Sequence, residues 1–427
     1  MSAIPVPSSL PSLASPNGHY VVGSSRPVAT PLRLMGFECS LDTSPLDALE
    51  RQARAISPEW VRDSFECVDG TEEVALLTTC HRVELVLLLR GGEDGLRWHE
   101  ALPGPRDLWR VREGGDVVRH LFRVAAGRES LARGEGEVRH QVRLAGSRVI
   151  SRHPRPVLRE LLARASDAAE ALASPSAVSP SIAAVAASRL LALVRRHEPT
   201  VLVIGSGTVG RQVVEGLGKN ARVTVLFHRN PPDPAWLKES GARAAPMDRL
   251  KESLAQADAA VTAAKFGDRG LRAVDLPRDH PLLLFDLGMP RNIDPDVREL
   301  SNVQLVDLET LHATREPSLP PYGADERLDE LADRCTERLA QLLMEPWIGA
   351  LRRSAEELRR GEFAAARPFL GRLEPAQELA VERLTQRLVA RLLQLPTERI
   401  RDLPAGPYGD LRRQWAIDLL RPRDPDP

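Results

Sequence analysis

The feature that most constrains the fold is the glycine-rich segment TVLVIGSGTVG at residues 200–210. Residues 200–204 form a continuous β-branched and aliphatic run, which is typical of a parallel strand buried on both faces. A GxGxxG turn follows directly and opens a helical pattern, so backbone N–H groups and a helix N-terminus can receive a pyrophosphate. We predict a dinucleotide site rather than a purely structural turn. Its residues are Gly205, Ser206, Gly207, Thr208, Val209 and Gly210.

The next strand-like run indicates which dinucleotide is bound. It ends in His228, Arg229 and Asn230, where an acidic residue would bond the ribose 2′-hydroxyl of NAD. Arg229 would instead pair with the 2′-phosphate of NADP. We therefore predict NADPH as the cofactor, the alternative being that Arg229 is an exposed arginine on a solvated loop.

The chain of 427 residues is too long for a single core, and its patterns change along its length. Residues 1–32 are rich in Ser, Pro and Gly and are expected to be disordered. Strand-like runs followed by a helical stretch predict an α+β domain over 33–172. Alternating strands and helices over 173–312 predict a doubly wound α/β domain. Leucines at helical spacing over 318–420 predict long amphipathic helices that need a partner, which dimerisation would supply. The strands expected in the α/β domain are 200–204, 223–227, 259–263, 282–286 and 303–306.

Composition excludes several classes of protein. The chain lacks both an apolar stretch of about 18 residues and a signal peptide pattern, which predicts a cytoplasmic protein with no membrane span. The net charge of -1 means that any nucleic-acid contact must come from a local patch. Arginines recurring between 139 and 164 at three-to-five-residue spacing suit one helix face directed at phosphates, or a plain solvated helix. DNA binding is not expected.

Cys80 is the candidate nucleophile. The four cysteines are widely scattered, which argues against a disulfide framework or a zinc site but leaves room for one reactive thiol. In LLTTCHRVEL, Cys80 lies in a turn between two strand-like runs, and Arg82 or a protonated His81 would favour the thiolate. The alternative is a buried cysteine acting as a small hydrophobic residue.

A second polar cluster lies in GRESLARGEGEVRHQV. Its Ser130, Glu135 and Gln141 suit the ammonium and carboxylate groups of an amino acid. The alternative is a solvated helical face.

These segments together resemble the glutamyl-tRNA reductase family. The family's cysteine motif resembles TTCHR, its substrate-binding stretch resembles HLFRVAAGRES followed by GE and Gln141, and its NADPH loop resembles VLVIGSGTVG. Later segments similar to the family are FDLGMPRNIDPDV, VDLETL, EPWIGALR and the dimerisation helix LTQRLVARLLQLPTERIR. The matches run in order from about Leu34 to Arg401 and so cover nearly the whole chain.

The resemblance implies a multidomain fold and an activity. The fold would be a V-shaped homodimer with a catalytic glutamyl-tRNA-binding domain, a Rossmann NADPH domain, a long spinal helix and an all-α dimerisation domain. The activity would be NADPH-dependent reduction of glutamyl-tRNA(Glu) to glutamate-1-semialdehyde through a cysteine thioester, the first committed step of C5-pathway haem biosynthesis. No metal is implied. Handover of the product to glutamate-1-semialdehyde aminomutase is implied as well.

The family's roles carry over to particular positions. Cys80 would be the catalytic nucleophile, and His120 would lie nearby as a second catalytic residue. The residues that would hold the glutamyl moiety are Thr79, Arg82, Ser130, Glu135 and Gln141.

Some positions depart from the family's pattern. The family's TTCNR reads TTCHR, its early His and Lys are absent, and Lys265 stands where a small residue is expected near the nicotinamide. His140 replaces a helical glycine and is expected to crowd the substrate pocket. These changes leave open a degenerate, non-catalytic NADPH-binding paralogue that acts as a partner or regulator in the haem pathway. An ordinary dehydrogenase of a small metabolite would leave the C-terminal helices and the cysteine motif unexplained.

Overall fold

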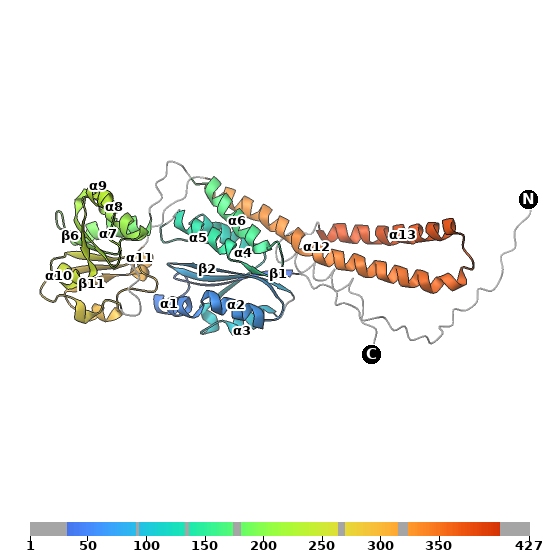
Figure 1. The fold of residues 1–427 in the computed structure, drawn as a ribbon, viewed down its shortest axis with the longest axis horizontal. Helices are drawn as coiled ribbons and strands as arrows, with labels where there is room; N and C mark the ends of the chain where they lie inside the picture. Colours follow the sequence, from blue (N-terminus) through green and yellow to red (C-terminus); the bar gives the residue numbers. More distant parts are fainter. Residues whose placement is uncertain are drawn as a thin grey trace, which may run out of the picture.

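The structure is a computed structural model that describes residues 32–90, 94–132, 136–173, 181–263, 270–314 and 323–401. Three parts follow one another along an elongated molecule (Figure 1). A parallel-sheet domain lies at one end, the N-terminal domain lies in the middle and a pair of long helices forms the other end. The predicted fold class is confirmed. The predicted extension lies outside the described residues except for Leu32.

The N-terminal domain is built on a five-stranded antiparallel sheet with the order β4-β1-β3-β2-β5. Its strands are β1 (Leu32–Ser40), β2 (Thr71–Thr79), β3 (Arg82–Arg90), β4 (Arg110–Glu113) and β5 (Ile150–Ser151). One face is covered by α1 (Leu46–Ala55), α2 (Pro58–Cys67) and α3 (Asp94–Ala101). The other face is covered by α4 (Gly115–Ala125), α5 (Gly136–Ser147) and α6 (Val157–Ala171). Because both faces are covered, the central strand β3 carries a nearly continuous apolar run.

The second domain is a six-stranded parallel sheet with the order β11-β10-β9-β6-β7-β8. Its strands are β6 (Thr200–Ile204), β7 (Arg222–Phe227), β8 (Arg243–Pro246), β9 (Ala259–Thr262), β10 (Leu282–Asp286) and β11 (Val303–Val306). Its helices are α7 (Ile182–Val194), α8 (Thr208–Leu217), α9 (Pro234–Ser240), α10 (Leu250–Leu254) and α11 (Leu308–Ala313). All five predicted strands are present, and β8 is an additional edge strand.

Two long helices form the third part. The helix α12 (Ala324–Ala366) has 43 residues and is about 65 Å long. Its first half belongs to the core of the N-terminal domain through Leu328, Ala332 and Leu339. Its second half packs against α13 (Pro375–Arg401). The predicted amphipathic helices are therefore present.

One face of α13 carries exposed leucines at helical spacing, namely Leu384, Leu388, Leu392 and Leu395. This apolar stripe is the unpartnered face that the sequence predicts. Among the described residues, none of the helices combines the length and apolarity needed to cross a membrane.

Candidate active site

Cys80 lies at the boundary between the first two domains. The pairing of Thr79 with Arg82 leaves Cys80 and His81 as a two-residue hairpin turn between β2 and β3, so the predicted position in a turn is confirmed. Cys80 is half-buried, whereas Cys39 and Cys335 are buried. It packs against a hydrophobic cluster that joins Leu46 and Leu131 of the N-terminal domain to the apolar core of the parallel-sheet domain. The thiol therefore lies where the two domains meet.

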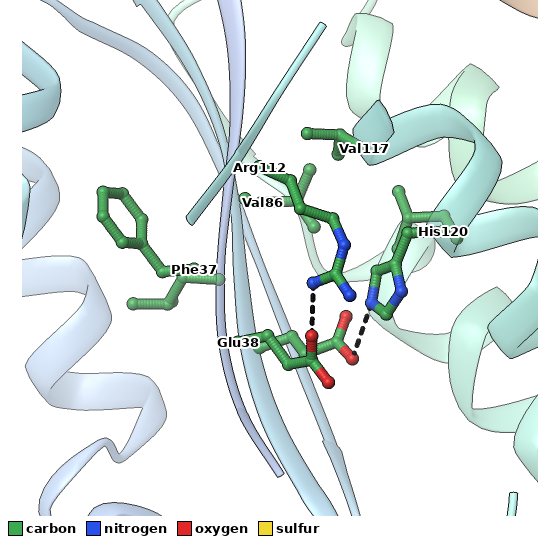
Figure 2. A pocket seen from close by; sticks show the side chains of 10 residues that line it. Phe37, Glu38, Val86, Arg112, Val117 and His120 are labelled. Atoms are coloured by element: carbon green, nitrogen blue, oxygen red, sulfur yellow. Dashed lines mark hydrogen bonds and ion pairs between the residues drawn. The ribbon is translucent and has the colours of Figure 1, made fainter. Parts of the chain in front are cut away.

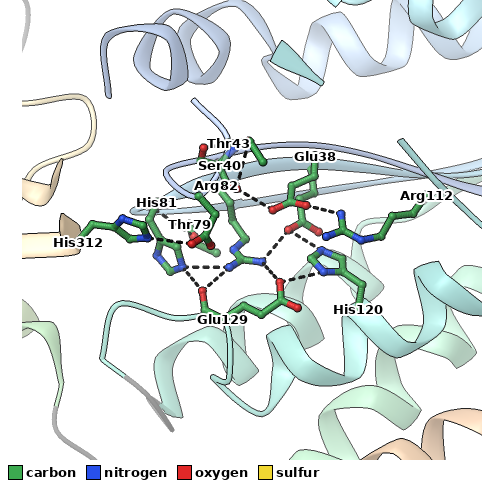
Figure 3. Close-up of polar contacts among 12 residues, drawn as sticks. Glu38, Ser40, Thr43, Thr79, His81, Arg82, Arg112, His120, Glu129 and His312 are labelled. Carbon is green, nitrogen blue, oxygen red and sulfur yellow. Dashed lines mark hydrogen bonds and ion pairs between the residues drawn. The ribbon is translucent and has the colours of Figure 1, made fainter. Parts of the chain in front are cut away.

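Polar contacts fasten the two domains on either side of this boundary. Arg291, which follows β10, binds Glu50 of α1 with Nε 3.0 Å from Oε1 and also pairs with Asp47. On α11, His312 Nε2 lies 3.1 Å from Asp42 Oδ1. Figure 3 shows His312 approaching His81 from the parallel-sheet domain. The two domains are thus docked with Cys80 between them.

His81 is a neutral neighbour of the thiol. Its side chain is buried, with Nδ1 3.4 Å from Cys80 Sγ and Nε2 3.0 Å from the Glu129 carbonyl oxygen. Burial and then the charge of Arg82 lower the pKa of His81 to about 3. The expectation that a protonated His81 favours the thiolate is therefore wrong, because burial and the adjacent guanidinium keep the resting imidazole neutral.

A buried charge network lies directly behind the hairpin turn (Figure 3). The Arg82 side chain is fully buried, with Nη1 2.9 Å from Glu84 Oε1 and 3.4 Å from Glu129 Oε2. Its Nη2 donates to the Glu129 carbonyl oxygen. On α4, His120 places Nε2 3.0 Å from Glu84 Oε1 and Nδ1 2.9 Å from Glu129 Oε2. Both ring nitrogens of His120 therefore face carboxylates.

The network continues to β1 and β4 (Figure 2). Glu38 accepts a hydrogen bond of 2.7 Å from Ser40 and pairs with Arg112 beside a small pocket that His120 also lines. Glu38, Glu84 and His120 bring ligand-type atoms within 4.8 Å of one another. These atoms already take part in ion pairs with arginines or with each other, so the group is better described as an ion-pair network than as a metal centre.

The charges in this network balance. The pKa of His120 is reduced by burial, but Glu84 and Glu129 outweigh that effect and raise it to about 9. Burial acts against the charge on Glu84, yet His120 and Arg82 lower the pKa of this carboxyl to about 2. Three cations (Arg82, Arg112 and the His120 imidazolium) thus face three carboxylates (Glu38, Glu84 and Glu129).

The charge on His120 predicts a pH-dependent stability. Because its pKa rises from 6.5 to about 9 on folding, this contribution is complete below about pH 6.5 and is lost as the pH rises through about 9. We expect the melting temperature of the wild-type protein to fall across this window. His120→Gln should fall less steeply, as measured by calorimetry between pH 6 and pH 10. Parallel curves for the two proteins would contradict the assignment of the proton to His120.

Several predicted substrate-binding residues surround the network. Thr79 is buried and its Oγ1 accepts a hydrogen bond of 3.3 Å from the His81 N–H. Ser130 follows Glu129 and is buried, and its Oγ has no hydrogen-bond partner among the described residues. The same holds for Arg82 Nε. A buried polar atom without a partner is costly, and a ligand is one way to satisfy it.

The remaining predicted residues of this set have different outcomes. On α5, Gln141 Oε1 is also buried without a partner in the described part of the chain. No hydrogen bond or ion pair between described residues links Gln141 to the network around Arg82. Glu135 and Lys265 lie outside the described residues. His140 is exposed on α5, so the expected crowding of the pocket by His140 is wrong.

Sequence reasoning missed all three carboxylates of the network. Glu84 is a lone acidic residue in the apolar strand RVELVLLLR, and that isolation is a usable signal. Glu129 lies directly before Ser130 in the polar stretch GRESLARGEGEVRHQV. Glu38 and Arg112 lie on β1 and β4 and are 74 positions apart in the sequence. Only the pairing of these two strands brings them together.

The glycine-rich turn has the geometry that a pyrophosphate requires. It leads from β6 into α8, which begins at Thr208, and Gly205 has a φ of 120°. A Cβ on Gly210 would lie 2.0 Å from the Gly205 carbonyl oxygen, whereas a Cβ on Gly207 would meet nothing within 4 Å. Gly210 is thus required for packing, and the space above Gly207 is open to a ligand. Arg229 is exposed just beyond the end of β7.

Known proteins resemble all three parts of the chain. Residues 38–174 match the model of the glutamyl-tRNAGlu reductase N-terminal domain, and residues 324–419 match that family's dimerisation domain. Residues 186–314 match shikimate / quinate 5-dehydrogenase, which makes the parallel-sheet domain a nucleotide-binding domain of the dehydrogenase type. The dimerisation-domain match supports a homodimer.

Curated relatives cover most of the chain. A glutamyl-tRNA reductase of Syntrophotalea carbinolica is 30% identical over 83% of this chain and 86% of its own length. Glutamyl-tRNA reductase 2 of a Nocardioides species is 31% identical over 86% and 87%. A solved structure of glutamyl-tRNA reductase from Methanopyrus kandleri is 25% identical, covers 91% of this chain and 98% of that one, and has a TM-score of 0.46. On the combined sequence matches, the chain belongs to the glutamyl-tRNA reductase family.

Proposed function

We propose that this protein reduces glutamyl-tRNA(Glu) to glutamate-1-semialdehyde with NADPH, through a thioester on Cys80. The observation that carries the proposal is the position of the thiol. Cys80 packs against the hydrophobic cluster that joins the two domains, and it lies two residues before Arg82, whose Nε is buried without a partner among the described residues. A nucleophile between an acyl pocket and a dinucleotide domain suits reduction of a covalently held acyl group.

The chemistry follows from the sulfur. Attack of Sγ on the ester carbonyl forms a C–S bond and breaks the C–O bond to the tRNA ribose, which leaves as an alcohol. The resulting thioester is more electrophilic than the ester it replaces. When bound, NADPH would supply the hydride that reduces this thioester, and the C–S bond would then break to release the semialdehyde and return the Cys80 thiolate. The docked domains would keep water away from the intermediate.

Buried polar groups of the N-terminal domain match the glutamyl group. Arg82 Nε and Ser130 Oγ can donate to a carboxylate, and Gln141 Oε1 can accept from an ammonium group. Thr79 and Glu135 complete the proposed binding set. His120 would act by holding Arg82 and the Glu129 carboxylate in place rather than by accepting a proton, because both of its nitrogens face carboxylates.

The decisive experiment is an assay of the purified full-length protein with charged tRNA and NADPH. Semialdehyde formation supports the proposal. Binding of NADPH without any semialdehyde would favour the non-catalytic paralogue. Rescue of a 5-aminolaevulinate auxotroph provides an independent screen.

Arg229 provides a test of cofactor choice. The exposed guanidinium at the end of β7 is free of an adjacent acidic residue in HRN, so it can pair with a 2′-phosphate. We expect NADPH to bind more tightly than NADH, and Arg229→Ala to weaken NADPH binding by about 10-fold or more with little effect on NADH. Fluorescence titration measures both affinities. Arg222→Ala, an arginine at the start of the same strand, is the matched control.

Equal affinities of the wild-type protein for NADPH and NADH would contradict this specificity.

The wider assignments belong to the same proposal. The domain limits are 33–172, 173–312 and 318–420, the location is the cytoplasm and the product is passed to glutamate-1-semialdehyde aminomutase. The proposed tRNA contacts are the arginines between residues 139 and 164. They lie on α5, on α6 and in the segment between these helices, so the single helix face expected from their spacing is wrong. Among them, Arg143 pairs with Asp167 and Glu170, and Arg164 pairs with Glu160, so these two offer less free charge to phosphates.

A further inference from the structure

We propose that His81 takes the proton of the Cys80 thiol and delivers it to the ribose oxygen that leaves when the acyl group is transferred from tRNA. This inference rests on the proposed function and adds a second catalytic residue to it. It follows from the contacts of the two ring nitrogens.

The contacts of His81 define its tautomer. The Glu129 carbonyl oxygen, which can only accept, lies 3.0 Å from His81 Nε2. The donor Arg82 Nη2 lies farther from the same nitrogen, at 3.3 Å, and already donates to that carbonyl, so we assign the hydrogen to Nε2. In a neutral imidazole the other nitrogen then has a lone pair. That nitrogen, Nδ1, lies 3.4 Å from Cys80 Sγ and can accept the thiol proton.

The turn holds this arrangement in place. The His81 backbone N–H donates to Thr79 Oγ1 at 3.3 Å, and its carbonyl accepts from the Leu41 N–H at 3.1 Å. The ring is buried and contacts Glu129 at its far end. The ring nitrogen therefore stays directed at the sulfur without a search among rotamers.

Acyl transfer from an oxygen ester to a thiol needs a proton donor. The tetrahedral intermediate contains both a C–S and a C–O bond, and a thiolate leaves more readily than an alkoxide. Without a proton on the ribose oxygen the intermediate returns to the ester. A general acid at this oxygen directs the collapse toward the thioester.

The surroundings of His81 suit a residue that holds the transferred proton only transiently. Burial and the neighbouring Arg82 lower the pKa of His81 to about 3, so the imidazolium is a strong acid. The thiol proton moves to Nδ1 as the C–S bond forms, and it moves on to the ribose oxygen as the C–O bond breaks. His81 ends the step neutral, Cys80 carries the acyl group and tRNA leaves with its hydroxyl restored.

Neighbouring groups are less suited to this role. Arg82 remains protonated, and both nitrogens of His120 face Glu84 and Glu129. His312 points its Nε2 at Asp42. Among these groups, His81 is the one whose ring nitrogen Nδ1 has a lone pair and lies within hydrogen-bond distance of the sulfur.

The test compares two leaving groups in the full-length protein. Cys80 is acylated in a single turnover, without NADPH, by glutamyl-tRNA or by the S-phenyl thioester of glutamate. The thiophenolate of the second donor leaves without needing a proton. His81→Phe keeps a ring of similar volume, and His81→Asn keeps a hydrogen-bonding side chain, but neither can pass on a proton. Rates are measured from released tRNA or thiophenol and from the mass of the acylated protein.

We expect both variants to lose at least about 100-fold in rate with glutamyl-tRNA, the range of a general acid, and to lose clearly less with the thioester, which needs His81 only to take the thiol proton. His312→Phe is the matched control, because it changes a histidine at the same interface and should alter the two rates in equal proportion. Equal losses with both donors in the His81 variants, or no loss with either, would overturn the proposal.

Failure of the proposed function gives a different result. If wild-type Cys80 takes no glutamyl group from tRNA, the reductase assignment fails on its own. The variants are then compared with ethyl acetate and S-phenyl thioacetate, since only the ethyl ester needs a protonated leaving oxygen. A selective loss with the ethyl ester still supports the role of His81, and its absence rejects it.

Discussion

Cys80→Ser is expected to abolish semialdehyde formation from glutamyl-tRNA, with a loss of at least about 10⁴-fold, as found when an enzyme's nucleophile is removed. A serine hydroxyl stays protonated at neutral pH and forms an ester no more reactive than the tRNA ester it replaces. The product is measured after its conversion to 5-aminolaevulinate. Mass spectrometry of the wild-type protein without NADPH should find a glutamyl group on Cys80.

The matched control is Cys67→Ser. Cys67 is the exposed thiol at the end of α2, and its loss should leave the rate unchanged. A glutamyl adduct on Cys67, or substantial activity in Cys80→Ser, would remove the basis of the proposed mechanism.

Arg82→Met is expected to reduce the free energy of unfolding by about 3–5 kcal/mol, the usual cost of removing one partner from a buried ion pair. The side chain is 0% exposed, and its loss leaves Glu84 with one counterion fewer. Methionine fills most of the volume, so the effect reports charge rather than a cavity. Urea unfolding followed by circular dichroism measures the change.

The sign of the pH dependence provides a second check on Arg82→Met. In the wild-type protein His120 and Arg82 oppose burial and hold the pKa of Glu84 near 2. Without Arg82 burial raises that pKa, so protonation on acidification should shrink the stability difference between variant and wild type. Arg143→Met removes an exposed ion pair and should cost no more than about 1 kcal/mol. An equal decrease in the free energy of unfolding for Arg82→Met and Arg143→Met would contradict the larger contribution assigned to the buried network.

The nucleotide-binding domain was predictable because its buried parallel strands are continuous aliphatic runs. The strand β8 (Arg243–Pro246) was not, since its short edge sequence RAAP carries no apolar pattern and its pairing depends on the free edge of β7. For α12, leucine spacing predicts a helix but not its partners. One half packs on the N-terminal domain and the other half on α13.

The site was predictable only as far as local sequence determines it. The two-residue turn carrying Cys80 is a local feature, because the strand-like runs on either side bracket it. The charge state of His81 is not, since the largest cause of its low pKa is burial, and part of its surroundings comes from Glu129, which is 48 residues away. The same holds for His120, whose proton is held by carboxylates from β3 and from beyond α4.

The pairing of β2 with β3 fixes the position of the Cys80 thiol. Along β3, Arg82 and Glu84 face α4, while Val83 and Leu85 face the opposite apolar core. A slip of one residue in the pairing of β2 with β3 would exchange these faces. Two charged side chains would then lie in the apolar core, and the Cys80 sulfur would be displaced from the neighbouring domain. The position of the nucleophile is therefore set by the hydrogen bonds between the strands of the sheet. A single residue inserted in this hairpin would inactivate the protein even if the surrounding helices still assembled.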